Sequence, residues 1–116
     1  MAIGLVTVVE TQLFVRQAKG VWTEAEREEF VIYIAGHPEA GDVIADTGGV
    51  RKVRWSRAGA GKRSGVRVVY FYRDAAWPLY LLLVYAKGRQ ENLTPDEKRK
   101  VREIAATLKG KRRSMA

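Results

Sequence analysis

The fold is decided by residues 66–87, "VRVVYFYRDAAWPLYLLLVYAK", which hold two strand-like runs and one turn. Residues 66–73 are rich in valine and tyrosine, which are residue types that favour strands. Residues 74–78, "DAAWP", break this pattern and predict a turn. Residues 79–87 show no alternation of polar and apolar side chains, which indicates a strand that is buried on both faces and central in its sheet.

Further strands are expected on the N-terminal side of this hairpin. Residues 50–55, "VRKVRW", predict a strand, and residues 56–65, "SRAGAGKRSG", predict a flexible glycine-containing connection. Residues 38–49 contain three glycines and are expected to form a loop. Residues 5–10, "LVTVVE", are rich in β-branched side chains and predict a first strand.

An N-terminal helix is predicted over residues 23–36. Thr23 can cap it, and Glu26 stands three residues later, at the spacing of a capping box. Gly36 and Pro38 then end it. The preceding residues 11–20 are amphipathic but short and predict a helical turn, so the N-terminal half is expected to hold one or two helices.

The last predicted element is a C-terminal helix with clear end signals. Thr94 is the expected N-cap, Pro95 suits the first helical position and Glu97 completes a second capping box. Apolar side chains then recur at helical spacing, at Val101, Ile104, Ala105 and Leu108. Gly110 is expected to end the helix, ahead of a basic tail at residues 111–116 that is expected to be disordered.

Short links between three of the strands predict an antiparallel sheet of about four strands with helices packed against it, which is an α+β fold. The chain has 116 residues, a length that fits one compact domain, here residues 1–110 followed by the tail.

The composition restricts the class of partner. The formal net charge is +8, so the expected partners are polyanions: nucleic acid, an acidic protein or an anionic membrane surface. There is no cysteine, which excludes disulfides and thiolate metal sites. We expect a soluble cytoplasmic protein, because no signal peptide is evident and the longest apolar run, residues 75–86, is too short to span a bilayer.

The positive charge is concentrated in residues 47–73, which hold eight basic residues and no Asp or Glu. Strand alternation puts Lys52 and Arg54 on one face of their strand and Arg51 on the other. Neighbouring strands can then gather Arg54, Arg67 and Lys87 around one patch. The same alternation predicts that Lys87 ends the face that carries Leu81, Leu83 and Tyr85.

Several fixed cations beside aromatic rings are what binding to a phosphate backbone and to unpaired bases requires. A solvated basic face without a ligand is the alternative. RNA also carries its own nucleophile, the 2′-hydroxyl, so cations that stabilise the crowded phosphorane can support strand cleavage. The single histidine, His37, is interpreted as a capping residue at a helix end, and no acidic cluster has metal-ligand spacing.

Three linked stretches resemble the RelE/ParE superfamily of bacterial toxins, and within it the HigB-type branch. They are "GDVIADTGGVRKVRW" at 41–55, "GKRSGVRVVYFY" at 61–72 and "YLLLVYAKGRQENL" at 80–93. The resemblance extends from about Gly41 to Ile104. It implies a small α+β fold with two N-terminal helices on a twisted antiparallel sheet.

The resemblance also implies an activity and its partners. Toxins of this kind are ribosome-dependent endoribonucleases that cut mRNA in the A site of the 70S ribosome, use no metal or cofactor, and are neutralised by a cognate antitoxin. We therefore expect a toxin that is a monomer when free and that cleaves RNA by attack of its 2′-hydroxyl.

Carried over by position, the resemblance implies a set of site residues. Arg67 matches the strand arginine that contacts the scissile phosphate, and the other expected catalytic cations are Lys87, Arg54 and Lys62. The residues expected to bind RNA or the ribosome are Arg51, Lys52, Arg57, Arg63, Tyr70, Tyr72 and Tyr85. Some relatives carry a catalytic tyrosine near the C-terminus; residues 104–116 have none, so that role is absent here or passes to Tyr70, Tyr72 or Tyr85.

Two other functions remain open at this point. The superfamily also contains ParE-like toxins, which inhibit DNA gyrase and cut no RNA. A non-enzymatic basic module that binds RNA or DNA would show the same charge, with binding that weakens steeply as salt rises.

Overall fold

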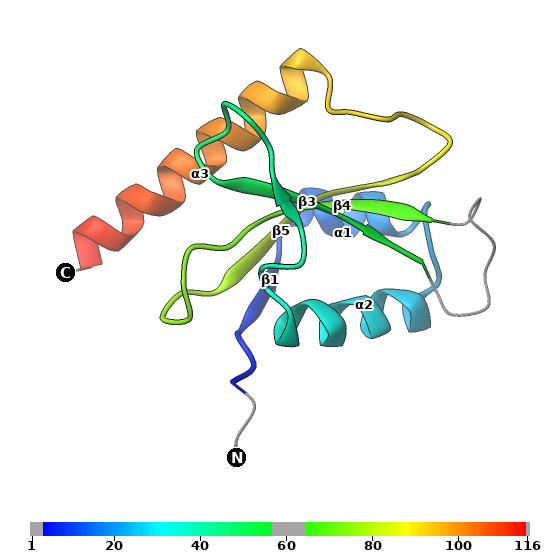
Figure 1. Ribbon diagram of the computed structural model, residues 1–116, viewed down its shortest axis with the longest axis horizontal. Coiled ribbons are helices and arrows are strands. Elements are labelled where there is room, and N and C mark those ends of the chain that lie inside the picture. Colours follow the sequence, from blue (N-terminus) through cyan, green and yellow to red (C-terminus); the bar gives the residue numbers. More distant parts are fainter. Residues whose placement is uncertain (1–3, 57–64, 116) are drawn as a thin grey trace.

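The computed structural model describes residues 4–56 and 65–115, with residues 111–115 described by their backbone alone. In chain order the elements are β1 (Val8–Glu10), α1 (Gln12–Ala18), α2 (Glu24–Gly36), β2 (Asp42–Val43), β3 (Val50–Trp55), β4 (Val66–Phe71), β5 (Leu79–Ala86) and α3 (Pro95–Met115) (Figure 1). The α+β fold with two N-terminal helices and a C-terminal helix is therefore confirmed.

The strands form one sheet in the order β1-β5-β4-β3-β2. The β3, β4 and β5 strands are antiparallel neighbours, as their short links predict. The outer strand β1 pairs with β5 in parallel, so the sheet is mixed rather than wholly antiparallel. Sequence reasoning did not reveal this pair because α1 and α2 and three strands separate its two members along the chain.

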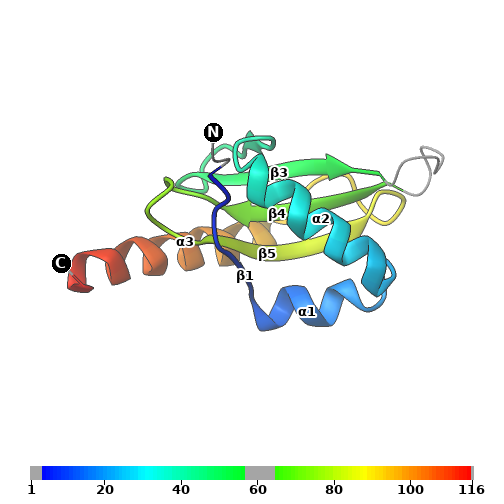
Figure 2. The same ribbon diagram turned by 90° about the horizontal axis from the view of Figure 1, so that it is seen from below.

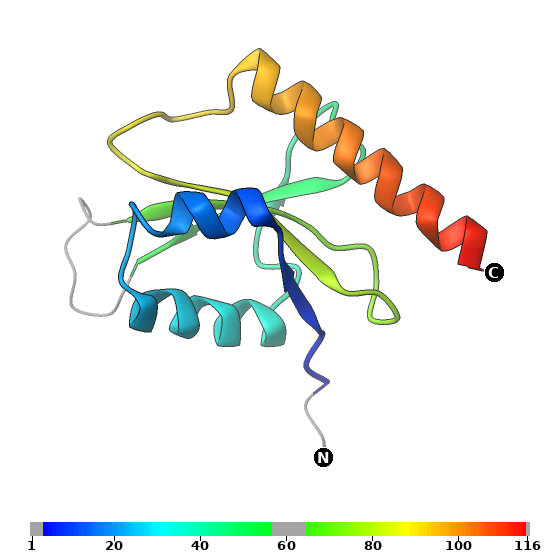
Figure 3. The same ribbon diagram turned by 180° about the vertical axis from the view of Figure 1, so that it is seen from behind.

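The sheet lies between two layers of helix. On one face, α1 and α2 pack over a core that includes Phe14, Phe30, Ile34, Tyr70 and Leu81. On the other face, a smaller core joins α3, through Val101 and Ala105, to side chains of β3, β4 and β5. Figure 2 shows α2 crossing in front of the sheet with α3 behind it, and Figure 3 shows α1 and α2 from their own side.

The β5 strand is buried on both faces along most of its length, as predicted. Its register against β4 shifts between Val69, which pairs with Leu83, and Tyr70, which pairs with Leu81. β5 therefore has one extra residue, Leu82, at this point. The expectation that Leu81 shares a face with Leu83 and Tyr85 was wrong, because a bulge reverses the alternation of side chains on either side of it.

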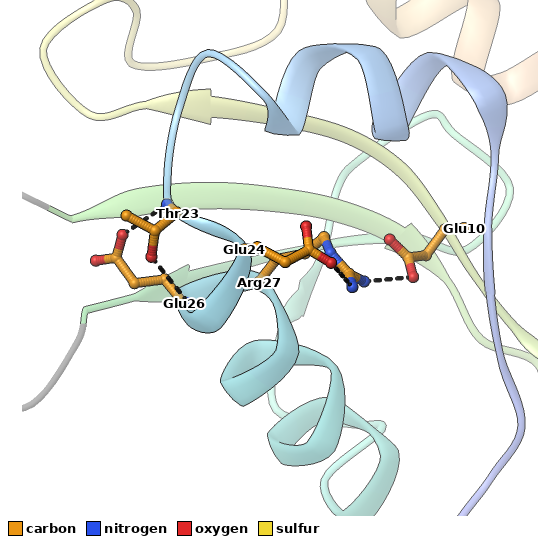
Figure 4. A network of polar contacts seen from close by, with 5 residues as sticks. All are labelled: Glu10, Thr23, Glu24, Glu26 and Arg27. Atoms are coloured by element: carbon orange, nitrogen blue, oxygen red, sulfur yellow. Dashed lines mark hydrogen bonds and ion pairs between the residues drawn. The ribbon is translucent and has the colours of Figure 1, made fainter.

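Both predicted capping boxes are present. Glu26 N donates to Thr23 Oγ1 (3.1 Å), and Thr23 N donates to Glu26 Oε1 (2.8 Å) (Figure 4). The same reciprocal pair, at 3.1 and 3.0 Å, joins Thr94 and Glu97 at the start of α3. These local signals fix where α2 and α3 begin.

Several element boundaries differ from the predictions. Residues 11–20, where the sequence predicts a helical turn, contain the helix α1, capped by Thr11. The first strand is confined to β1, and the expected loop at 38–49 contains the short strand β2. Gly110 does not end α3, which continues to Met115, because one glycine costs a helix only about 1 kcal/mol.

Candidate functional site

Arg67 lies on β4, the middle strand of the sheet, and the residue as a whole is only 4% exposed. Its register partners are Arg54 on β3 and Tyr85 on β5. Residues that pair across a sheet point to the same face, so these three side chains form a line across three strands, which we call the cross-strand row. The row lies on the face opposite α1 and α2, because Tyr85 belongs to the α3-side core.

The helix α3 covers only part of this face. Val50 and Phe71, which pair with each other at one end of β3 and β4, share a core with Val101 of α3, and Lys109 lies over the Phe71 ring. The start of α3, at Glu97, lines a cavity together with Tyr85. Arg54 and Arg67 pair toward the opposite end of the same two strands. The alternation of side chains on β3 and β4 therefore brings Arg54 and Arg67 together on one face, as the sequence predicted.

No carboxylate within residues 4–56 and 65–110 forms an ion pair with Arg54 or Arg67. The ion pairs in this part of the chain are Arg27 with Glu10 and Glu24, and Asp96 with Arg99 and Lys100. A buried guanidinium without a carboxylate carries an uncompensated desolvation cost. An anionic ligand that reaches Arg67 would offset that cost.

Lys52 and Arg51 have different surroundings. Lys52 pairs with Val69 in the β3–β4 register, so it lies on the face of the cross-strand row. Its ammonium donates to Glu91 O (3.4 Å) and to Asn92 Oδ1 (3.2 Å), in the loop before α3. Arg51 instead donates to Gly41 O (2.6 Å) and holds the segment that leads into β2, so it lies outside the row.

Lys87 directly follows β5. Its backbone N–H donates to Gly65 O (3.1 Å). Gly65 directly precedes β4 and stands two residues before Arg67, so Lys87 lies at the end of the sheet where β4 begins. Its half-buried side chain lines a cavity of about 450 Å³ with Gly88, Gln90 and Glu91. Arg57, Lys62 and Arg63, the remaining predicted site cations, lie outside the described residues.

The structure separates the three candidate tyrosines. Tyr70 faces the α1–α2 layer; its hydroxyl accepts a hydrogen bond from Gly41 N and donates one to Pro38 O, both at 2.8 Å. Tyr72 packs against the same layer. Tyr85 alone stands beside Arg67 in the cross-strand row.

The Tyr85 hydroxyl is buried and has no hydrogen-bond partner among the described residues, and the whole residue is 6% exposed. Burial raises the pKa of this phenol, while the positive charge of Arg67 partly opposes the rise. The carboxylates of Glu97 and Glu91 raise that pKa further. Tyr85 is thus a neutral hydrogen-bonding group, placed between a cation and two carboxylates.

Sequence reasoning missed Glu91 and Glu97 as part of this region. Glu97 was recognised only as a capping residue and Glu91 not at all. The available signal was their position shortly after Lys87, in the segment that must return from β5 to α3. Their approach to Tyr85 depends on the path of that loop, which no local pattern specifies.

His37 occupies the C-cap of α2, as expected. Its Nδ1 lies 2.9 Å from Tyr33 O, and its ring stacks on Tyr33 at 4.6 Å between centroids. Within the described residues, no three or more His, Asp and Glu side chains gather as metal ligands, and no helix is long and apolar enough to cross a membrane.

These features define a class: a small α+β domain with a cationic row on the sheet face that its N-terminal helices leave open. The chain belongs to the RelE family. The family model described as "RelE toxin of RelE / RelB toxin-antitoxin system" matches residues 6–115. The protein is therefore a toxin of a toxin–antitoxin system, and its family implies an antitoxin partner.

Proposed function

We propose that this toxin is a ribosome-dependent endoribonuclease of the HigB type, which cuts mRNA in the A site of the 70S ribosome. The observation that carries the proposal is Arg67: a buried residue, 4% exposed, that lies on the middle strand and whose guanidinium pairs with no carboxylate among the described residues. A group in this position binds an anion strongly, because charge attraction is larger in a poorly hydrated site than in water.

In the proposed reaction, Arg67 binds the scissile phosphate of the mRNA. The 2′-oxygen forms a bond to phosphorus and the bond from phosphorus to the 5′-oxygen breaks, leaving a 2′,3′-cyclic phosphate and a 5′-hydroxyl. The 2′-hydroxyl releases its proton to one water molecule, and the leaving 5′-oxygen takes up a proton from another. Arg67 stabilises the extra negative charge of the phosphorane, with Arg54 and Lys87 as neighbouring cations.

Tyr85 and Lys52 support the same site. The pKa of Tyr85 is raised by burial, so its hydroxyl stays protonated at neutral pH and can donate a hydrogen bond to the RNA beside Arg67. Lys52 holds the loop before α3 through exposed contacts with Glu91 and Asn92. Because Arg67 is shielded, substrate binding must include a local opening, and a phosphate that binds Lys52 would replace these loop contacts.

In this proposal the ribosome holds the mRNA in position for cleavage. His37, the one histidine, caps α2, and its ring stacks on Tyr33. A site of Arg, Lys and Tyr gains most when its substrate is already held in a reactive conformation, and a codon bound in the A site can provide that positioning. We also propose that the toxin is a monomer when free and that its antitoxin blocks this activity.

The test compares Arg67→Met with Arg73→Met. Arg73 is exposed and follows β4, so the two variants lose the same charge from neighbouring positions. We expect Arg67→Met to reduce mRNA cleavage on translating ribosomes by about 100-fold or more. Its melting temperature should stay the same or rise, because the variant removes an uncompensated buried charge.

Arg73→Met should cleave like the parent protein. Full cleavage by a folded Arg67→Met variant would contradict the assigned site. A protein that inhibits growth with intact transcripts and damaged DNA would instead act as a gyrase inhibitor. Tight, salt-sensitive RNA binding without any cut would indicate a binding module.

A further inference from the structure

A polar cavity of about 300 Å³ opens at the edge of β5, beside the cross-strand row. It exists because β1 pairs with β5 only from Leu79 to Leu81, so the later residues of β5 have no neighbouring strand on that side. There the side chain of Gln17 takes the place of a strand and accepts a hydrogen bond from Val84 N (3.0 Å). The end of α1 and the loop after β5 form the other walls.

Several side chains that can form hydrogen bonds line this cavity. The polar side chains that line it are Gln17, Tyr85, Arg89, Gln90 and Glu97. The volume lies at the lower limit of the range for ligand sites, which suits a ligand about as large as a nucleobase. We call this space the Tyr85 cavity.

Tyr85 connects the cavity to the proposed cleavage site. It forms part of the cavity wall, and it is the direct register partner of Arg67. Its residue is 94% buried, since 6% is exposed, and its hydroxyl is unpaired among the described residues. An unpaired buried hydroxyl destabilises a fold, so a ligand gains binding energy if a local opening of the cavity lets it pair with this group.

Glu97 provides a fixed acceptor in the same wall. Its Oε1 accepts hydrogen bonds from Thr94 N (3.0 Å) and Gln90 Nε2 (2.9 Å), which hold the carboxylate in place. Its Oε2 has no partner among the described residues. A carboxylate accepts hydrogen bonds from the exocyclic amino groups of bases. Uracil has no such group and presents carbonyl oxygens on both sides of its ring N–H, which a fixed carboxylate repels.

We propose that the Tyr85 cavity binds one base of the mRNA, next to the phosphate held by Arg67, and favours bases with an exocyclic amino group over uracil. The inference rests on the proposed mRNA cleavage. Single-stranded RNA is read in this way, by bases that leave the stack and pair along their edges with side chains. The cavity then determines where the toxin cuts, while Arg67 determines whether it cuts.

The experiment maps cut positions on mRNA in a translating extract and compares the bases beside each cut. The parent protein should cut rarely where uracil occupies one fixed position adjacent to the scissile phosphate. Glu97→Gln keeps an acceptor for the helix cap but adds an amide donor that can pair with uracil. It should raise the share of cuts with uracil at that position by about fivefold or more relative to the parent protein.

Two further variants separate base recognition from a structural effect. Arg89→Ala removes an exposed side chain from the cavity and should also change the base preference. Thr94→Ala weakens the same helix cap but does not line the cavity, so it should leave the preference unchanged. An unchanged preference in both cavity variants, or the same change in Thr94→Ala, would overturn the inference while cleavage itself persists. A parent protein that makes no cuts would overturn the proposed function and this inference with it.

Discussion

Arg67 and Tyr70 lie three residues apart on β4, and the odd spacing turns them to opposite layers. The polar group of Tyr70 is fully used, because its hydroxyl joins Gly41 and Pro38 on either side of it. Arg67 has no comparable partner among the described residues. Tyr70 therefore stabilises the fold, while the guanidinium of Arg67 has no such contacts within the described part of the chain and is proposed to bind a ligand.

This contrast predicts different stabilities for two tyrosine variants. Tyr70→Phe should lower the free energy of unfolding by about 1–3 kcal/mol, because it leaves Gly41 N and Pro38 O unpaired in a partly buried site. Tyr85→Phe should change that free energy by less than about 0.5 kcal/mol or raise it, because its hydroxyl has no partner to lose. Urea unfolding of both variants measures the difference. Equal losses would mean that the Tyr85 hydroxyl is paired in the folded protein.

At the scale of elements, the short strand β2 reaches the sheet through a close approach at Gly41. A Cβ atom on Gly41 would lie 2.9 Å from Lys52 O and 2.9 Å from Tyr70 Cε1. No side chain fits there unless β2 moves away from β3. At Gly110 in α3, by contrast, an added Cβ meets nothing within 4 Å.

The two glycines therefore predict opposite effects for the same substitution. Gly41→Ala should lower the free energy of unfolding by about 1–3 kcal/mol, through overpacking against backbone and the Tyr70 ring. Gly110→Ala should raise it by about 0.5–1 kcal/mol, because alanine is the better helix former. Thermal unfolding of the two variants provides the measurement. A stable Gly41→Ala protein would show that β2 does not pair with β3 as described.

The elements that the sequence predicted well are those with signals close together in the chain. The capping boxes at Thr23 and Thr94 gave the starts of α2 and α3, and β-rich runs gave β3, β4 and β5. The parallel pairing of β1 with β5 and the bulge at Leu82 depend on tertiary packing. No local pattern encodes either feature.

Some features of the candidate site were likewise predictable from the sequence, and others were not. Strand alternation alone predicted that Arg54 and Arg67 share a face, and their register confirms it. Only the side-chain contacts show that the Tyr70 hydroxyl is used within the fold and that the Tyr85 hydroxyl has no partner among the described residues. The Tyr85 cavity depends on where β1 ends, on the path of the loop after β5 and on the cap of α3. These features come together only in the folded protein, so the sequence did not predict the cavity.

At the scale of the whole molecule, charge is distributed unequally between the two sides of the sheet. On the α1–α2 side, Arg27 is held by Glu10 (2.6 Å) and Glu24 (2.5 Å), which ties β1 to the start of α2 (Figure 4). On the other side, no described ion pair involves Lys52, Arg54 or Arg67. The chain therefore neutralises Arg27 where it stabilises the fold and, within the described residues, gives no carboxylate partner to the cations where RNA is proposed to bind.

Arg67 is the residue on which the proposed cleavage of translated mRNA depends. The most direct measurement maps new mRNA 5′ ends in cells that express the parent protein or Arg67→Met, with translation active and with translation initiation blocked. We expect abundant new ends for the parent protein only while translation proceeds, and a loss of about 100-fold or more in Arg67→Met. New ends that persist without translation, or that Arg67→Met produces at the parent level, would contradict this expectation.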